Sequence, residues 1–402
     1  MIYRIAWKQL WSKPLTTFLL LLVLATSIGL SVLVGTLGVG FQQGLTTATE
    51  PFTLLVGSTG SSQQLVMNTV FLQDRPLGNI PYAEVDKLRS QPKLVLAAVP
   101  LAMGDNVQGF RIIGTEPEIF TLRPKRNAPE WLRIDKGEQF KKPFEAVIGS
   151  AVAERTGLKV GDTFNSTHGN VSKGKAHAEH PFTVVGILDT TNGPYDQAVL
   201  TSIESIWDLH SSINKTGEHT DKKGAVTTIL VEPMGYNQAY MLASTYSSRK
   251  DVQLVFPAQI IVQLFNLMGR GEQIWRPVGY LIISLSLIVM IVTIYLATMG
   301  RIKDYAILKT LGASSKQLYA ILCSQSLTII LLGVVIGTIG GFSAYAAIAN
   351  YVTSTSAIHV PSSITLIPYA LLGIIILAGF LASLIPLYIL QRRIDSLLSS
   401  MY

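Results

Sequence analysis

Five of the six histidines in this 402-residue chain fall between residues 168 and 219, and imidazole is a preferred ligand of zinc, copper, nickel and iron. In a helix, His177 and His180 would bring two imidazoles within reach of one ion, with Glu179 and Asp208 as oxygen donors. The alternative is that exposed, flexible loops simply collect histidine. The candidate ligands of a non-catalytic zinc are His168, His177, His180, His210 and His219.

One glycine-rich stretch approaches the phosphate-binding loop of ATPases. Gly169, Gly174 and Lys175 have the required spacing, but Ala176 cannot supply the hydroxyl group that holds magnesium. The sequence also contains no G-x-S-x-G nucleophile elbow. We therefore predict that this chain is not an enzyme.

Four apolar runs without charged residues organise the chain, and each exceeds the roughly 20 residues that a helix needs to cross a bilayer. They are Leu15–Val39, Val278–Met299, Leu318–Tyr351 and Ile364–Gln391. The first run could belong to a signal peptide, because bases precede it. It is longer than the usual apolar core of about 7–15 residues, and no small-x-small cleavage site follows, so we predict an uncleaved anchor.

The excess positive charge lies beside these runs. The three segments on one side of the runs carry nine Lys and Arg and two Asp, which accounts for the whole formal net charge of +7. Short loops rich in Lys and Arg remain in the cytoplasm, so we predict that both termini are cytoplasmic. Because this orientation explains the basicity, we expect no nucleic-acid partner.

The predicted fold is a multi-pass α-helical membrane protein with four membrane helices and a large mixed α/β extracytoplasmic domain between the first and the second. The predicted order is a cytoplasmic N-terminus (1–14), a first membrane helix (15–39), the extracytoplasmic domain with stalk helices (40–273), a second membrane helix (278–299), a cytoplasmic loop (300–317), a third membrane helix (318–350), a short external loop (351–363), a fourth membrane helix (364–391) and a cytoplasmic tail (392–402).

Within the extracytoplasmic domain, short stretches rich in β-branched and aromatic residues predict strands, and stretches with helical spacing predict helices. The strands are expected at Phe52–Val56, Gln64–Phe71, Leu94–Val99, Phe110–Ile113, Phe182–Ile187 and Val226–Val231. The helices are expected at Tyr82–Ser90, Ser150–Thr156, Ile203–His210 and Ala258–Glu272. Polar composition predicts exposed loops at Asn165–His180 and Ser211–Lys223.

The third apolar run carries glycines at helical spacing, at Gly333, Gly337 and Gly341. A G-x-x-x-G pair with small neighbours lets another helix approach closely, so we predict a packing face. The alternative is that glycine is simply common in membrane helices.

The loop between the second and third runs predicts a short amphipathic helix that ends at Gly312. By sequence physics alone, such a helix could lie on lipid or dock on a partner. The loop resembles the cytoplasmic loop of MacB/FtsX/LolC-type ABC transporter permeases, whose pattern is R-x-x-E-x-A-I-L-[RK]-x-L-G-A. The matching residues are Arg301, Ala306, Ile307, Leu308, Lys309, Leu311, Gly312 and Ala313, and Asp304 stands where the family has Glu.

Other segments extend this resemblance over essentially the whole chain. Val147–Ser150, Gly157–Asp162 and Phe182–Leu188 resemble recurring motifs of the family's external domain. Ile385–Leu387 and Arg392–Asp395 resemble its C-terminus, although Ser396 replaces the usual proline.

The resemblance implies a permease subunit in the inner (plasma) membrane of a bacterium, with ATP and magnesium bound by a separate cytosolic ABC ATPase. It also implies a second permease copy, with a homodimer expected, membrane lipid around the helices and a periplasmic adaptor or lipoprotein outside. The expected ATPase-coupling residues are Arg301, Asp304, Ala306, Ile307, Leu308, Lys309, Leu311 and Gly312. The stalks would be the helix after Leu37 and the segment Ala258–Gln273.

The expected activity is mechanical export or extraction of a lipoprotein, peptide, amphipathic drug, haem or metal-related substrate. The alternative is an FtsX-type transmembrane regulator, which activates an external cell-wall hydrolase without transport. A receptor without an ATPase would leave the loop motif without a purpose.

Overall fold

The computed structural model describes residues 2–12, 14–124, 128–168, 180–211, 224–264, 266, 307–355 and 359–361, together with isolated positions between 284 and 299 and at 373, 377 and 381. The chain divides into two compact units. The first comprises Met1–Phe41, Met268–Tyr351 and Pro361–Tyr402, and the second comprises Gln42–Leu267 and Val352–Val360.

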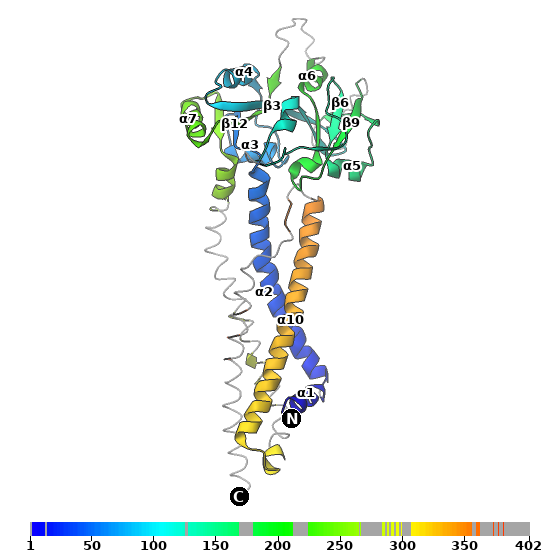
Figure 1. Cartoon of the computed structure of the whole chain (residues 1–402), viewed down its shortest axis with the longest axis vertical. Coiled ribbons are helices and arrows are strands. Elements are labelled where there is room, and N and C mark those ends of the chain that lie inside the picture. The colour runs from blue at the N-terminus through cyan, green and yellow to red at the C-terminus, as the bar shows by residue number, and fades with distance from the viewer. Residues whose placement is uncertain are drawn as a thin grey trace. The chain divides into compact units, whose positions relative to one another are not determined.

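The second unit is built on a mixed sheet (Figure 1). Its main path runs β13 (Val252–Val255), β1 (Leu54–Ser58), β12 (Thr228–Pro233), β3 (Val95–Val107), β4 (Phe110–Thr115), β10 (Ala198–Ser202), β6 (Glu145–Ile148), β9 (Phe182–Leu188) and β5 (Ile134–Gly137). The pairs β4–β10 and β6–β9 are parallel, and the other neighbours on this path are antiparallel. The short strands β7 (Thr163–Phe164) and β8 (Thr167–His168) pair with β9 and β3, and β2 (Ile80–Pro81) pairs with β11 (Ala225–Val226).

Both faces of this sheet are buried, because successive side chains of its central strands enter two different cores. In β1, Leu54 and Val56 belong to one core and Leu55 belongs to the other. Strands β6, β10 and β12 alternate in the same way. Since side chains of a strand point alternately to opposite faces, strands this apolar require cover on both sides.

Helices provide that cover. One face carries α4 (Ala83–Arg89), α5 (Ser150–Thr156), α6 (Ile203–Ser211) and α7 (Tyr236–Ser247). The opposite face carries α3 (Ser62–Thr69) and the 3₁₀ turns η1 (Pro117–Thr121) and η2 (Pro194–Gln197). Figure 1 shows α4 and α6 on one side of the strands and α3 on the other.

The end of α2 (Pro14–Thr49) and the helical residues 257–264 also contribute to the core on the α3 side. Leu45 and Ala48 come from the last turns of α2, and Ile260 and Ile261 come from the helical residues 257–264. These are the described parts of the two predicted stalks, so each stalk is anchored by apolar side chains in the core of the second unit.

The prediction of a strand at Gln64–Phe71 is wrong, because α3 occupies Ser62–Thr69. The Oγ atom of Ser61 accepts a hydrogen bond from the backbone N–H of Gln64 at 3.2 Å and caps the helix. Leu65, Val66 and Thr69 are buried on one helical face. The S-x-x-Q sequence that starts at Ser61 is a helix-start signature, and it outweighs the β-propensity of the run.

Several other predicted elements are confirmed within a residue or two, including the helix at Ser150–Thr156 and the strands β4 and β9. The predicted loop Asn165–His180 is wrong at its start. Thr167 and His168 form β8, and Thr167 pairs with Asn106 of β3. A strand of two residues is too short for a periodic pattern to reveal it.

A buried carboxylate ties α4 to the end of α7. Glu84 is 5% exposed, and it accepts hydrogen bonds from the Tyr246 hydroxyl at 2.7 Å and from Arg249 Nη2 at 3.0 Å. Burial acts to raise the pKa of Glu84, but the bonds from Arg249 and Tyr246 outweigh it and hold this pKa below its ordinary value. A hydrogen bond from the same Arg249 lowers the pKa of Asp251 to about 2.

The first unit is helical where it is described. Its helices are α1 (Ile2–Trp11), most of α2 and most of α10 (Ser315–Thr355). Among the described residues, α2 and α10 are the two helices long and apolar enough to cross a membrane. The predicted membrane helices at 278–299 and 364–391 lie largely outside the described residues.

The ion pair of Arg249 yields a test of stability. Replacing Arg249 with Met removes the closest cation of the buried Glu84 and leaves only the more exposed Lys87 beside it. We expect this to cost about 2 kcal/mol, or a fall in Tm of roughly 4–8 °C. Differential scanning fluorimetry of the detergent-solubilised protein would measure the change. Arg133→Met is the matched control, because the Arg133–Asp189 pair is exposed at 60% and 53%.

The same variant should change the pH dependence. The pKa values of Glu84 and Asp251 are lower in the folded state than their ordinary values of 4.5 and 3.8. The two carboxylates therefore add to the free energy of unfolding above their ordinary pKa values, and this contribution is lost as the pH falls toward about 2. Arg249→Met should flatten this acid limb, and an unchanged limb would show that the pair does not stabilise the fold.

Candidate functional site: the coupling segment and the seam between helices α2 and α10

The predicted coupling helix stops where the sequence places its glycine. Gly312 has a φ of +94°, a left-handed conformation that favours glycine. The N–H of Gly312 donates to the carbonyl of Lys309 at 3.1 Å, and the N–H of Ala313 donates to the carbonyl of Leu308 at 3.0 Å. These two bonds form a Schellman motif, which satisfies the last carbonyls of the helix.

The next helix begins at once. The N–H of Gln317 donates to Ser314 Oγ at 3.3 Å, and the N–H of Ser314 donates to Gln317 Oε1 at 2.9 Å. This reciprocal capping box starts α10. Only residues 311–314 separate the two helices, and both helix ends are closed by hydrogen bonds, so the joint is a defined turn rather than a slack linker.

The apolar side chains of the coupling segment divide between two directions. Leu308 is partly buried and packs on a cluster formed by Ala6 and Leu318, together with Ile321 and Leu322. Ile307 and Leu311, one helical turn apart, are 58% and 78% exposed. Leu308 therefore holds the segment against α10, and Ile307 and Leu311 form the free apolar face, which we call the docking face.

The remaining predicted coupling residues are less completely placed. Lys309 is half-buried, and its carbonyl takes part in the Schellman motif. Arg301, Asp304 and Ala306 lie outside the described residues.

Helix α10 meets α2 through the glycines that the sequence marks as a packing face. A Cβ atom on Gly337 would lie 2.6 Å from the carbonyl oxygen of Ala25, and one on Gly341 would lie 2.7 Å from that of Gly29. A Cβ atom on Gly333 would overlap the side chain of Leu24. Since Cβ atoms do not approach so closely, the two backbones touch only because these positions lack side chains.

Helix α2 also contributes a glycine to this contact between α2 and α10, which we call the seam. A Cβ atom on Gly29 would lie 3.0 Å from the carbonyl oxygen of Gly337, so both helices contribute a glycine at the closest approach. Apolar side chains fill the rest of the seam, and its buried members are Leu10, Leu24, Ile28, Val32, Ile329, Ile330 and Val334. By contrast, a Cβ atom on Gly340 would meet nothing within 4 Å, so this glycine points away from the seam.

The predicted zinc ligands fall mostly outside the described residues. His177 and His219 lie outside them, and the side chains of His168 and His210 are not described. His180 is exposed and stacks on Phe144 with ring centroids 5.1 Å apart. Among the described residues, no group of three His, Cys, Asp or Glu side chains could hold a metal ion. The zinc site therefore stays a prediction.

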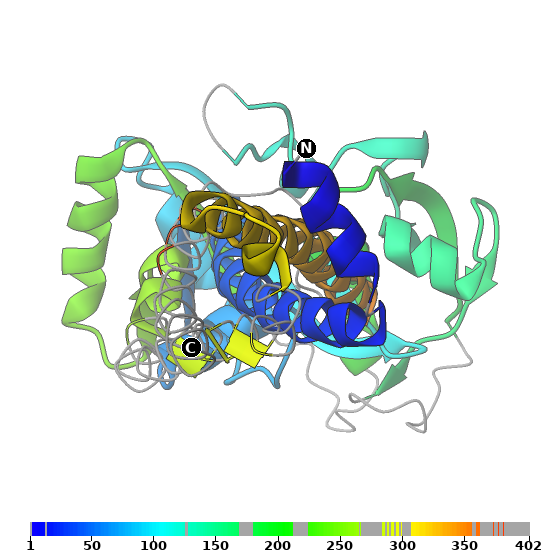
Figure 2. The same cartoon turned by 90° about the horizontal axis from the view of Figure 1, so that it is seen from below.

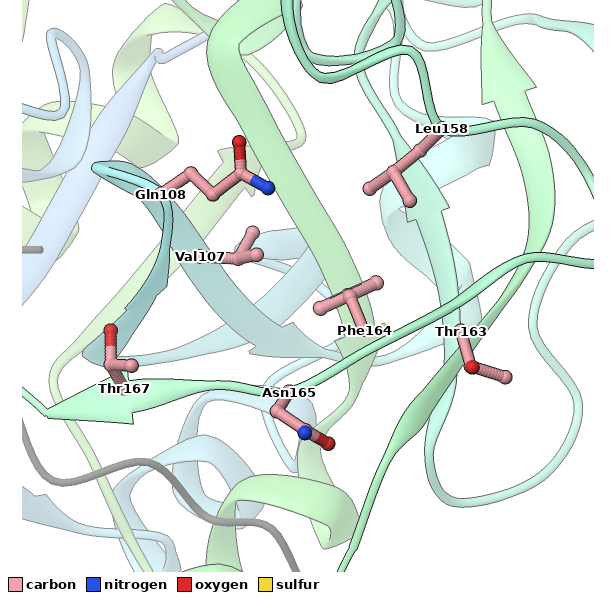
Figure 3. Close-up of a pocket in the computed structure, with 7 residues that line it drawn as sticks. All are labelled: Val107, Gln108, Leu158, Thr163, Phe164, Asn165 and Thr167. Carbon is pink, nitrogen blue, oxygen red and sulfur yellow. The ribbon is translucent and has the colours of Figure 1, made fainter.

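A hollow of about 440 Å³ opens on the second unit beside the β3–β4 turn (Figure 3). Val107, Leu158 and Phe164 supply its apolar surface. The other lining residues are polar but uncharged, and they are Gln108, Thr163, Asn165 and Thr167. Such a lining suits a group that is apolar with a few hydrogen-bonding atoms.

Two family models match this chain. The MacB-like periplasmic core domain matches residues 17–253, more than half of the chain, and the FtsX-like permease C-terminal domain matches residues 278–393. The chain belongs to the MacB/FtsX-type ABC transporter permeases, which confirms the resemblance found in the sequence. Permeases of this type are generally non-catalytic membrane components that work with a cytosolic ABC ATPase. The second unit is therefore the external domain, and α2 and α10 are membrane helices.

Among solved structures, the chain is similar to the periplasmic region of MacB from Actinobacillus actinomycetemcomitans. The sequences are 11% identical, the match covers 54% of this chain and 96% of that chain, and the TM-score is 0.35. Comparison with curated proteins gave no match.

Two glycines of α10 provide a matched test of the seam. Gly337→Ala should force α2 and α10 apart at a cost of about 1–3 kcal/mol. Gly340→Ala should be neutral or stabilise the helix by about 0.5–1 kcal/mol, because its Cβ meets nothing. Unfolding by SDS in mixed micelles would measure both changes. Equal effects of the two substitutions would show that α2 and α10 do not touch at Gly337.

The joint at Gly312 can be tested separately. No atom crowds a Cβ at Gly312, so Gly312→Ala should cost only the left-handed backbone conformation, about 1 kcal/mol. Amide hydrogen exchange at residues 312 and 313 should then become about five-fold faster. Gly312→Asn should show a smaller increase, because asparagine tolerates this conformation. Unchanged exchange in both variants would contradict the Schellman motif.

Proposed function

We propose that this chain is the permease subunit of a bacterial inner-membrane ABC exporter or extractor that works as a mechanical relay. A separate cytosolic ATPase would dock on Ile307 and Leu311 and would move the coupling segment as it binds and hydrolyses ATP. A second copy of the permease would complete the machine. Both termini would lie in the cytoplasm, as the charge distribution predicts.

The observation that carries the proposal is the joint at residues 311–314. Because a Schellman motif and a capping box close both helix ends, movement of the docking face would pass to α10 without being absorbed by a flexible loop. Ile307 and Leu311 also lie one helical turn apart and are 58% and 78% exposed, so a partner that buries both would gain apolar contact area.

The seam and α2 support the remaining steps. Backbone contact at Gly337 and Gly341 leaves α2 and α10 little freedom to slide past each other. Helix α2 is continuous over 36 residues, or about 54 Å, and its last turns place Leu45 and Ala48 in the core of the external domain. A continuous helix between the seam and that core is a suitable element for transmitting movement.

An amphipathic substrate is the class that the external domain favours. The hollow beside Val107 and Phe164 offers an apolar surface with an uncharged rim, which would accept an acyl chain, a peptide side chain or the ring of a drug. An external adaptor or lipoprotein would deliver or receive this substrate.

Affinity purification of the intact protein in mild detergent tests the proposal, with every co-purifying chain identified. An ABC ATPase together with an adaptor or lipoprotein is the expected result. An ATPase together with a cell-wall hydrolase would instead establish the transmembrane regulator. The absence of any ATPase would contradict the docking face.

The docking face itself can be probed by the double substitution Ile307→Asp/Leu311→Asp. Recovery of the ATPase should fall on the order of ten-fold or more, because two carboxylates would have to be buried in an apolar contact. The chain should remain in the membrane, since neither side chain packs within it. Leu96→Asp is the control, an equivalent change at a leucine of the external domain that is 61% exposed. Undiminished recovery of the ATPase would place its binding site elsewhere.

A further inference from the structure

Helix α1 has one face committed to the protein. Ala6 is 1% exposed and packs against Leu318, Ile321 and Leu322 of α10. Leu10 is 4% exposed and joins Leu24 and Ile329 in the seam cluster. Figure 2 shows α1 beside the first turns of α10. The helix therefore belongs to the packed structure of the first unit.

The face of α1 next to Ala6 and Leu10 is an aromatic ridge. Tyr3, Trp7 and Trp11 follow one another at intervals of four residues and are 60%, 41% and 66% exposed. The ring centroids lie 6.5 Å apart between Tyr3 and Trp7 and 6.2 Å apart between Trp7 and Trp11. Three large aromatic side chains in contact form a continuous apolar strip, unlike the scattered apolar residues of an ordinary surface.

Basic residues accompany this ridge. Arg4 and Lys8 are exposed and directly follow Tyr3 and Trp7 in the sequence, and the helix contains no acidic residue. Tryptophan and tyrosine prefer the headgroup level of a bilayer, and Lys and Arg are attracted to anionic headgroups. The combination matches the chemistry of an anionic lipid surface.

The junction with α2 fixes the orientation of α1. The hydroxyl of Thr17 donates to the carbonyl of Leu10 at 2.8 Å, so a side chain of α2 satisfies a carbonyl at the end of α1. At 10 residues α1 is too short to cross a bilayer, and the membrane helix α2 begins at Pro14, directly after it. A short helix joined in this way to the start of a membrane helix stays close to the end of that helix, where the membrane begins.

We propose that α1 is an interfacial helix, whose aromatic ridge enters the headgroup region of the cytoplasmic leaflet and whose Arg4 and Lys8 bind anionic lipid. The adjoining face, with Ala6, contacts the cluster on which Leu308 packs, so α1 meets both the lipid surface and this cluster. This inference depends on the membrane location of the chain and not on its substrate or its ATPase.

Quenching of tryptophan fluorescence by brominated lipid tests the proposal with the full-length protein in nanodiscs of phosphatidylcholine and phosphatidylglycerol. Two of the five tryptophans lie in α1. In the variant Trp7→Phe/Trp11→Phe, the quenched signal should fall to about half of the wild-type value or lower, with any remainder from Trp275 beside the second predicted membrane helix. Trp207→Phe is the control, because Trp207 belongs to the external domain, and it should leave the quenched signal unchanged. Equal quenching of the wild type and the double variant would overturn the proposal. The same result is expected if another protein chain, rather than lipid, covers the ridge.

The position of the bromine tests the preference for anionic lipid. With bromine on phosphatidylglycerol, the α1 tryptophans should be quenched at least about two-fold more strongly than with bromine on phosphatidylcholine, since each base near an anionic surface favours the contact by about five-fold. Arg4→Gln/Lys8→Gln should reduce this ratio to one while general quenching by lipid persists. Lys93→Gln/Lys250→Gln removes two exposed bases of the external domain and should leave the ratio unchanged. Equal quenching by the two brominated lipids in the wild-type protein would contradict the proposed preference for anionic lipid.

Discussion

The close approach of α2 and α10 is the constraint on which the first unit depends. Hydrogen atoms stand where side chains would otherwise be at Gly29, Gly337 and Gly341, and the two backbones come into contact there. In a membrane no hydrophobic effect drives helices together, so close van der Waals packing must provide the attraction. A methyl group at Gly337 would meet both a carbonyl oxygen and Ile28. The contact therefore leaves no room for a side chain at residue 337.

Short polar motifs connect this helix pair to the segment at residues 307–310. The Schellman motif at Gly312 and the capping box at Ser314 connect the coupling segment to α10 through four residues. Leu308 and Ala6 add an apolar contact at the same place. Backbone hydrogen bonds and side-chain packing thus act on the same joint. Within the described residues 307–314, Ile307 and Leu311 are apolar side chains that remain largely exposed.

The external domain follows a different principle, because its sheet is buried on both faces. Alternate residues of β1, β6, β10 and β12 fill two separate cores, and the ends of α2 and of the helix at 257–264 belong to one of them. A paired carboxylate at Glu84 ties together the helices that cover the other core. The end of α2 and the helix at 257–264 are therefore held in the external domain by apolar side chains, while the polar tie lies on the opposite face of the sheet.

The sequence by itself determined those features that depend on neighbouring residues or on whole segments. The length and apolarity of the first and third runs predicted α2 and α10, Gly312 predicted the helix stop, and the loop motif predicted the family. The sequence-based prediction was wrong at Gln64–Phe71, where β-propensity indicated a strand although Ser61 caps a helix. Glycine spacing also predicted the side of α10 that packs on a neighbour, but tertiary structure alone decided which leucine of the coupling segment is buried. Leu308 and Leu311 have the same chemistry, and only packing against α10 makes one a structural residue and leaves the other exposed. The reason is physical: helical periodicity creates an apolar face, but the burial of that face depends on residues that are distant in the sequence.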